Sequence, residues 1–299
     1  MPIYLLLPLA AAIIYALGSI IIKRALKEGV TMDQSFHLTN LVLGVLFLPF
    51  FFFGRGAFDW SQAGKPLMIG AAFFFGHWLT FIAIRRGDVS FVTPLMGTKV
   101  VFVAIGVVLL TGHIPSVPLL IAAVLTTIGI FVMGLADLKG GSHLAYTVLV
   151  TLVSALVFGL FDVFLSWWAP DFGGLTLVAL GMGVVPVFTM ILWLFQGRPA
   201  LMPDRKAAKW AWWGAGMIAL QAITMGIGLT FFNDATGVNV VYASRGLWVI
   251  VLLVVFGRIL GNSERHETGR GFLWRIGGTL ILTIAIIIAV ADRAAAIGN

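Results

Sequence analysis

The sequence predicts an all-α integral membrane protein of ten transmembrane helices, arranged as two inverted five-helix repeats. Of its 299 residues, 60% are hydrophobic and only 10% are charged, and the mean hydropathy is +1.06. Soluble domains are nearer one half apolar and one quarter charged. The apolar residues also gather in continuous runs long enough to cross a bilayer as helices, which takes about 20 residues each. A weak internal repeat is the third observation, because it places two intramembrane cations at matching positions.

The expected helices follow one another along the whole chain with short connections. Turn-forming stretches with glycine or proline, such as FFGRG, DLKGG and FQGRPALMP, separate the apolar runs. A membrane β-barrel would instead show short segments of alternating polarity. The ten expected helices cover residues 3–22, 36–53, 66–84, 90–111, 116–136, 144–168, 174–195, 208–232, 238–259 and 272–291.

Lysine and arginine residues predict the orientation of these helices, because cytoplasmic loops of membrane proteins carry an excess of them. The loops after the first, third, fifth, seventh and ninth helices hold 14 such residues, whereas the opposite side holds Arg55, Lys65 and Arg293. We therefore expect a multi-pass protein of the cell inner (plasma) membrane with both termini on the non-cytoplasmic side. The net charge of +7 is explained by these loops and does not require nucleic acid as a partner.

The two halves of the chain, residues 1–138 and 139–299, are weakly similar to each other. A shift of 146 residues lays GDVSFVTPLMGTK over NDATGVNVVYASR, with Lys99 on Arg245, and a shift of 143 lays YALGS (15–19) over FGLFD. Each half holds five helices, so the second half must enter from the opposite side of the membrane. Secondary transporters use such inverted repeats and bind substrate near the bilayer midplane between them.

Three stretches resemble the ten-helix branch of the drug/metabolite transporter superfamily, the EamA-like transporters. They are YALGSIIIK (15–23), FIAIRRGDVSFVTPL (81–95) and GLTFFNDATGVNVVYASR (228–245). The resemblance implies a ten-helix membrane transporter. In plastid phosphate translocators and nucleotide-sugar carriers of this superfamily, basic residues on helices 4 and 9 hold the substrate's phosphate, and Lys99 and Arg245 lie on those helices. The small multidrug exporters use a membrane-embedded glutamate instead, whereas all three glutamates here fall in loops.

Lys99 and Arg245 are expected within about 5 Å of the midplane, since they lie about nine and seven residues into their helices. A cation that faces lipid there costs at least about 3 kcal/mol, so both should face an aqueous cavity or a counter-charge. Asp162 is the single carboxylate well inside an expected helix, which makes it the candidate counter-ion or proton site. An Asp162–Arg245 ion pair is the structural alternative to substrate binding. One carboxylate cannot neutralise two bases, and the remaining positive charge favours an anionic substrate group.

Other polar side chains inside the helices are candidates for the walls of a binding site. Tyr242 lies three residues before Arg245 and therefore on the same helix face. His77 is expected near the midplane, where it can carry a proton or donate a hydrogen bond to substrate. Each such residue can equally serve a hydrogen bond between helices. The candidates besides Lys99 and Arg245 are Tyr242, Thr98, His77, Asn40 and Gln221.

Pro94 and Gly97 precede Lys99 in the fourth expected helix. Proline removes a backbone hydrogen bond, and glycine permits the helix to bend. The pair predicts either a local opening or gating hinge near the site, or an ordinary proline kink near the start of a helix.

The sequence indicates no enzyme: it has no catalytic constellation, no P-loop, no metal-binding HExxH motif and no cysteine. We therefore expect neither cofactor nor metal. The most consistent function is secondary active transport of a small anionic or zwitterionic metabolite, phosphorylated or carboxylate-bearing, by alternating access, in a monomer or homodimer. One alternative is an exporter of neutral or aromatic metabolites in which the cations are structural. The other is a flippase or scramblase for an anionic lipid headgroup.

Overall fold

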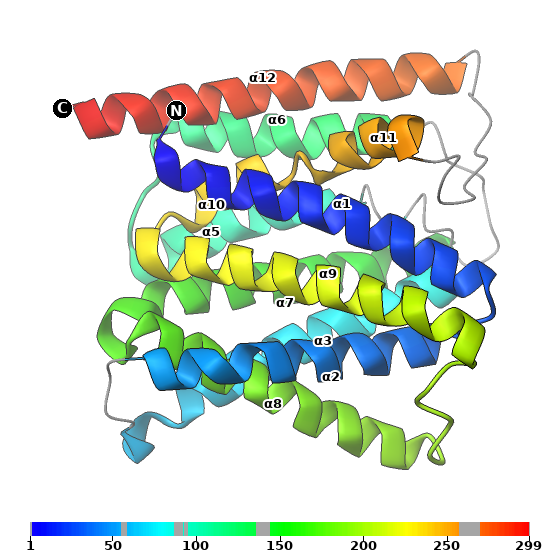
Figure 1. Cartoon of the computed structure of the whole chain (residues 1–299). Coiled ribbons are helices and arrows are strands. Elements are labelled where there is room, and N and C mark those ends of the chain that lie inside the picture. Colours follow the sequence, from blue (N-terminus) through cyan, green and yellow to red (C-terminus); the bar gives the residue numbers. More distant parts are fainter. Residues whose placement is uncertain are drawn as a thin grey trace.

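A computed structural model describes residues 2–54, 59–86, 92, 95–135, 144–256 and 270–298. These residues form helices and connecting turns, with no strand among them. Eight helices are long and apolar enough to cross a membrane, and shorter helices supply the fourth and ninth crossings. The expected all-α fold with ten crossings is therefore confirmed. The two termini lie at the same end of the helix bundle (Figure 1), as an even number of crossings requires.

Most crossings are single helices, and two are interrupted. The fourth crossing consists of the 3-10 helix η3 (Met96–Thr98) and α5 (Lys99–Thr111), and the ninth consists of α10 (Ala235–Tyr242) and α11 (Arg245–Phe256). Two more 3-10 helices are η1 (Ile3–Leu5) and η2 (Trp60–Gln62). The eight long helices are α1 (Leu6–Lys27), α2 (Met32–Phe53), α3 (Gly64–Arg86), α6 (Val117–Gly134), α7 (Leu144–Phe172), α8 (Gly174–Phe195), α9 (Arg205–Phe232) and α12 (Arg270–Gly298).

Local capping residues set several helix ends. Thr31 and Gln34 form a capping box at the start of α2, in which each side chain bonds the other's backbone N–H. Between α9 and α10, Asn233 adopts a left-handed conformation with φ 48°. The next residue, Asp234, accepts a hydrogen bond from the Gly237 amide at 3.0 Å and so begins α10. This tight connection fixes the depth at which the interrupted ninth crossing starts.

The contacts between the two halves are symmetric: when a helix of the first half packs on a helix of the second, the two corresponding helices also pack on each other. The first helix of each half packs on the third helix of the other, giving α1 on α9 and α7 on α3. The interrupted crossings pack in the same way, since α5 lies against α7 and α11 lies against α1. The self-related pairs are α2 with α8 and α6 with α12. This arrangement supports two repeats; the boundary between residues 138 and 139 lies outside the described residues and stays a prediction.

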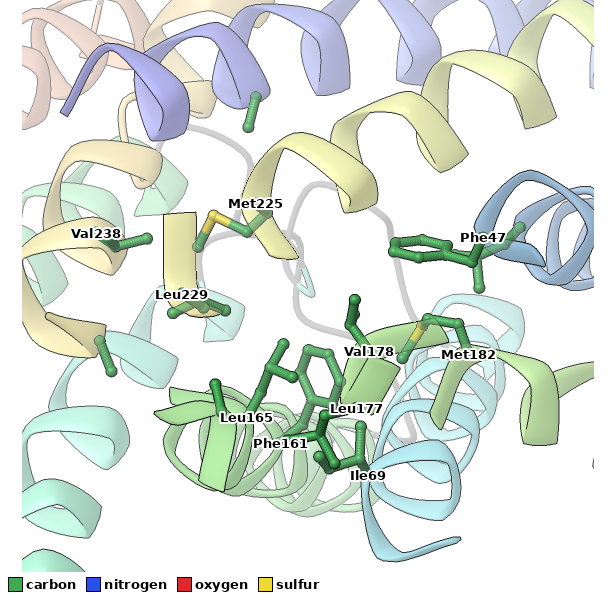
Figure 2. Close-up of a cluster of buried hydrophobic side chains, with 14 of the residues drawn as sticks. Phe47, Ile69, Phe161, Leu165, Leu177, Val178, Met182, Met225, Leu229 and Val238 are labelled. Carbon is green, nitrogen blue, oxygen red and sulfur yellow. The ribbon is translucent and has the colours of Figure 1, made fainter. Parts of the chain in front are cut away.

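A large apolar cluster joins the two halves at the centre of the bundle (Figure 2). Within a membrane, such contacts stabilise the fold by close packing and not by removal of apolar surface from water. Small residues permit the closest approach elsewhere: a Cβ at Gly129 of α6 or Gly278 of α12 would meet the backbone of the facing helix. The labelled cluster residues are Phe47, Ile69, Phe161, Leu165, Leu177, Val178, Met182, Met225, Leu229 and Val238.

Candidate functional site

Each interrupted crossing places its cation at the first residue after a 3-10 turn. Lys99 begins α5 directly after η3, and Arg245 begins α11 after a turn in which the Ser244 amide bonds the Val241 carbonyl at 3.1 Å. A 3-10 stretch within a longer helix often marks a functional hinge. Arg245 lies ten residues after the start of α10, or about 15 Å, which is half of a hydrocarbon core about 30 Å thick. This count takes the start of α10 as the boundary of the hydrocarbon core, and the depth of Arg245 near the midplane stays a prediction.

Lys99 is paired with Asp162. Its Nζ lies 2.6 Å from Asp162 Oδ2, and the side chains are only 11% and 1% exposed. α7 supplies this carboxylate across the contact between α5 and α7. Asp162 is thus a counter-ion, as expected from the sequence, but for Lys99. The alternative pairing of Asp162 with Arg245 is wrong, because depth along a helix does not say which face a side chain occupies.

Arg245 contacts aromatic rings. Its Cζ lies 4.8 Å from the ring centroid of Tyr242 and 5.1 Å from that of Tyr15 on α1. Among the residues that the structure describes, no carboxylate lies within ion-pair distance of Arg245. Cation–π contacts stabilise a guanidinium but leave its N–H donors directed at other acceptors. Tyr15 was not among the site residues predicted from the sequence. The 143-residue shift, which lays Tyr15 over Phe158, is the sequence signal that could have identified it.

Tyr242 lies between the two cations, on the helix face that the sequence predicts. The Nζ of Lys99 is 5.9 Å from its ring centroid, on which Arg245 also packs, and the Tyr242 residue is 5% exposed. Tyr15 meets the same ring edge to face at a centroid distance of 6.2 Å. The structure thus brings Lys99, Asp162, Tyr242 and Arg245 into one buried cluster, which we call the charged cluster together with Tyr15.

The hydroxyls that precede the two cations differ. Thr98 Oγ1 donates a hydrogen bond to the Leu95 carbonyl at 2.7 Å, so the predicted substrate contact of Thr98 competes with a bond it already makes. Ser244 Oγ is buried and has no hydrogen-bond partner among the described residues. A buried polar group without a partner costs about 1–3 kcal/mol. Ser244 therefore adds an unused donor beside Arg245, which sequence reasoning did not single out.

Two other candidates, His77 and Asn40, bind each other. His77 Nδ1 lies 2.7 Å from Asn40 Oδ1, which joins α3 to α2. The Asn40 Nδ2 donates to Thr189 Oγ1 of α8 at 3.0 Å. Asn40 thus serves a helix–helix hydrogen bond, the structural alternative that the sequence left open. Gln221 on α9 is also buried, and its amide makes no hydrogen bond to another described residue.

Of the two residues of the predicted hinge, Gly97 lies within the described residues and Pro94 lies outside them. Gly97 lies in η3, where its carbonyl accepts a hydrogen bond from Thr127 Oγ1 of α6 at 3.3 Å. A Cβ at this position would press on Ile130 of α6. Gly97 therefore permits close packing against α6, and a gating role stays a prediction.

The two ends of the bundle are tied by different contacts. At the end that holds the termini, Tyr4 donates to Asp234 Oδ2 at 2.7 Å, and Arg293 Nε approaches the same oxygen at 3.2 Å. This network ties η1, which precedes α1, and α12 to the start of α10. At the opposite end, Arg85 and Asp33 form an exposed ion pair, and His37 Nε2 lies 2.8 Å from Gln196 Oε1. No group of three or more metal-ligating side chains occurs within the described residues.

Ten crossings, two of them interrupted, are features that secondary transporters share. Residues 2–135, which include the first five crossings, match the model of the EamA-like transporter family. One solved crystal structure covers 97% of this chain and 96% of its own, with a TM-score of 0.73 and 14% identity, which shows a shared fold. No protein of curated function matches the chain. The first half of the chain is thus similar to the EamA-like transporters, in line with the resemblance read from the sequence, and the chain is a multi-pass membrane protein.

Proposed function

We propose that the protein transports a small metabolite with one anionic group, a carboxylate or a phosphate, and that Arg245 binds this group. The observation behind the proposal is the unequal neutralisation of the two cations. Lys99 faces Asp162 at 2.6 Å, whereas Arg245 faces the side chains of Tyr15 and Tyr242 and has no described carboxylate within ion-pair distance. The charged cluster therefore holds one positive charge more than it holds negative.

A cation at mid-membrane depth favours an anionic ligand, because an unpaired buried charge is costly. The guanidinium fork matches the two oxygens of a carboxylate or phosphate, and such bidentate pairs are among the stronger hydrogen bonds in proteins. The Ser244 hydroxyl, buried and without a described partner, supplies a further donor beside it. A monoanion fits this arrangement better than a zwitterion, since Asp162 is already engaged by Lys99 and is not free to bind an ammonium group.

Alternating access would follow from rocking of residues 1–138 against 139–299. The symmetric helix pairing and the 3-10 turns at both cations support this mechanism. The contact of Tyr4 with Asp234 at one end and that of His37 with Gln196 at the other each join the two halves, and they would break in turn as the two sides open. We further propose that the protein lies in the inner (plasma) membrane with both termini on the non-cytoplasmic side, which the lysine and arginine distribution supports. We propose that it acts as a monomer or homodimer.

A ligand screen on the purified protein tests the proposal. Thermal unfolding would be followed with a series of monocarboxylates, phosphate monoesters, zwitterionic amino acids and the neutral amides of the same acids. We expect monoanions to raise the Tm of the wild type and of Lys209→Gln, which removes a positive charge on the exposed start of α9. Arg245→Gln should abolish the shift. Stabilisation by neutral solutes alone, or a normal response of Arg245→Gln, would overturn the proposal.

A further inference from the structure

We infer that His77 presents a fixed hydrogen-bond acceptor, its Nε2, to an N–H or O–H group of the transported anion. This inference rests on the proposed function and adds to it a second recognition element and a chemical class for the rest of the substrate. It makes His77 a specificity-determining residue, with Asn40 and Thr189 as positioning residues behind it.

The hydrogen bonds behind His77 determine which ring nitrogen carries its proton. The single hydroxyl hydrogen of Thr189 is donated to the Val185 carbonyl at 2.8 Å. Thr189 can therefore only accept a bond from Asn40, which fixes the NH₂ group of Asn40 toward Thr189 at 3.0 Å and its oxygen toward His77. Since the Asn40 oxygen only accepts, His77 Nδ1 must carry the hydrogen of the 2.7 Å contact. In the neutral ring, Nε2 then holds a lone pair.

The surroundings leave this acceptor available to a ligand. Asn40 and Thr189 are fully buried, whereas His77 is partly exposed, and no described residue donates a hydrogen bond to Nε2. Three phenyl rings surround the imidazole, with centroid distances of 5.0 Å to Phe81, 5.1 Å to Phe36 and 5.9 Å to Phe73. An apolar or aromatic group that carries one donor suits such surroundings, because aromatic rings pack well edge to face or offset.

An aromatic wall connects His77 to the charged cluster. Phe73, which packs against His77, meets Phe158 of α7 at a centroid distance of 5.7 Å. The Phe158 ring in turn lies 5.7 Å from Lys99 Nζ. The rings of Phe73 and Phe158 thus form an apolar surface between the imidazole and Lys99, along which the apolar body of a ligand would pack. The chemical class is therefore an aromatic or apolar monoanion with one N–H or O–H donor.

Three matched acids provide the test: 4-hydroxyphenylacetate, 4-methoxyphenylacetate and phenylacetate. They share the carboxylate and the ring, and only the first carries a donor. We expect the purified wild type to bind 4-hydroxyphenylacetate about tenfold more tightly than 4-methoxyphenylacetate, because the latter leaves Nε2 unpaired. Arg245→Gln should weaken all three acids alike.

Two substitutions of His77 separate its nitrogens. His77→Asn keeps an amide near the Nδ1 position and loses the acceptor at Nε2, so the preference for the hydroxyl compound should fall to within about twofold. His77→Gln places an amide oxygen near the Nε2 position and should retain part of the preference. A merely structural histidine would lower the affinity for all three acids without changing their order.

Thr189→Val tests the positioning chain without altering the ligand contact. This isosteric change frees the Asn40 amide to turn over, so the ring proton is no longer held on Nδ1. The preference for 4-hydroxyphenylacetate should shrink, and the ¹⁵N resonance of His77 Nε2 should move from an unprotonated position toward a protonated one. The resonance is assigned by its loss in His77→Gln.

The outcomes separate the two proposals. Equal binding of the hydroxyl and methoxy compounds by the wild type, or an unchanged preference in His77→Asn, would overturn the role of His77 and leave the anion site at Arg245 intact. Binding of ring-free carboxylates but not of arylacetates would do the same. If no anion binds in an Arg245-dependent manner, the proposed function fails, and this inference fails with it.

Discussion

The fourth and ninth crossings have the same construction and a different charge balance. Each is interrupted by a 3-10 turn, and each begins its second segment with a cation that packs against the first helix of the other half. Lys99 meets Phe158 of that helix, and Arg245 meets Tyr15, which the 143-residue shift lays over Phe158. The two crossings therefore agree in the position of the cation and of its aromatic neighbour.

The carboxylate is what differs between the two crossings. Asp162 lies one turn beyond Phe158 and binds Lys99, whereas the corresponding residue beyond Tyr15 is Ser19, whose hydroxyl donates to the Ala16 carbonyl at 2.9 Å. Asp162 stands where the first half has Ser19, and it neutralises Lys99. Among the described residues, Arg245 has no corresponding carboxylate beside it. Under the proposed function, Lys99 in the first half has a structural role and Arg245 in the second half binds the substrate.

Removal of the carboxylate should have the largest effect on stability. Asp162→Asn leaves the Lys99 ammonium buried without its partner, so we expect a loss of about 3–5 kcal/mol in the free energy of unfolding. The loss would be measured by denaturant unfolding in detergent. Lys99→Met/Asp162→Leu removes both charges and should recover most of it. A fully stable Asp162→Asn variant would show that Lys99 does not depend on this ion pair.

The hydroxyls beside the cations offer a matched pair of substitutions. Ser244→Ala removes a buried group that has no described partner, so the unliganded protein should keep or slightly gain stability. Anion binding should weaken about tenfold if this hydroxyl donates to the substrate. Thr98→Val removes a hydroxyl already bonded to the Leu95 carbonyl and should leave binding unchanged. Thermal unfolding and equilibrium binding on the same samples check both expectations, and equal effects of the two changes on binding would remove the distinction.

Removal of the Tyr15 ring should have a smaller effect on anion binding. Tyr15→Leu removes one face of the cation–π contact at Arg245, which is worth about 1 kcal/mol, or about fivefold in the dissociation constant of a bound monoanion. Tyr15→Phe retains the aromatic face and should bind the anion as the wild type does. Isothermal titration of the three proteins measures the difference; a defect in Tyr15→Phe would show that the hydroxyl, not the ring, is what matters.

The sequence predicts features of this fold that depend on composition along the chain. Long apolar runs specify the helices, because every backbone polar group in a bilayer must be satisfied within the segment. Counting residues at 1.5 Å each also places Lys99 and Arg245 near the midplane, since depth is a one-dimensional quantity. The repeat, read from two shifts, indicates that both cations belong to equivalent positions.

Features that depend on rotation about a helix axis were not predicted. Asp162 has a depth similar to that of Arg245, yet it faces Lys99, because α7 packs on α5. The chain of His77, Asn40 and Thr189 joins three helices whose relative rotation no sequence pattern states. The interruption of the ninth crossing falls at Ala243 and Ser244. Neither residue breaks helices as proline does, so the sequence did not predict where the interruption lies.

The central claim, that Arg245 binds the anion while the charge of Lys99 is balanced by Asp162, is tested most directly by one binding experiment. The monocarboxylate that most stabilises the wild type would be titrated into Arg245→Gln and Lys99→Met/Asp162→Leu. We predict a loss of about 100-fold in affinity for Arg245→Gln and a change within about threefold for the double variant, whose net charge equals that of the wild type. Equal losses in both variants would contradict the account, because Lys99 would then contribute to the anion site as much as Arg245.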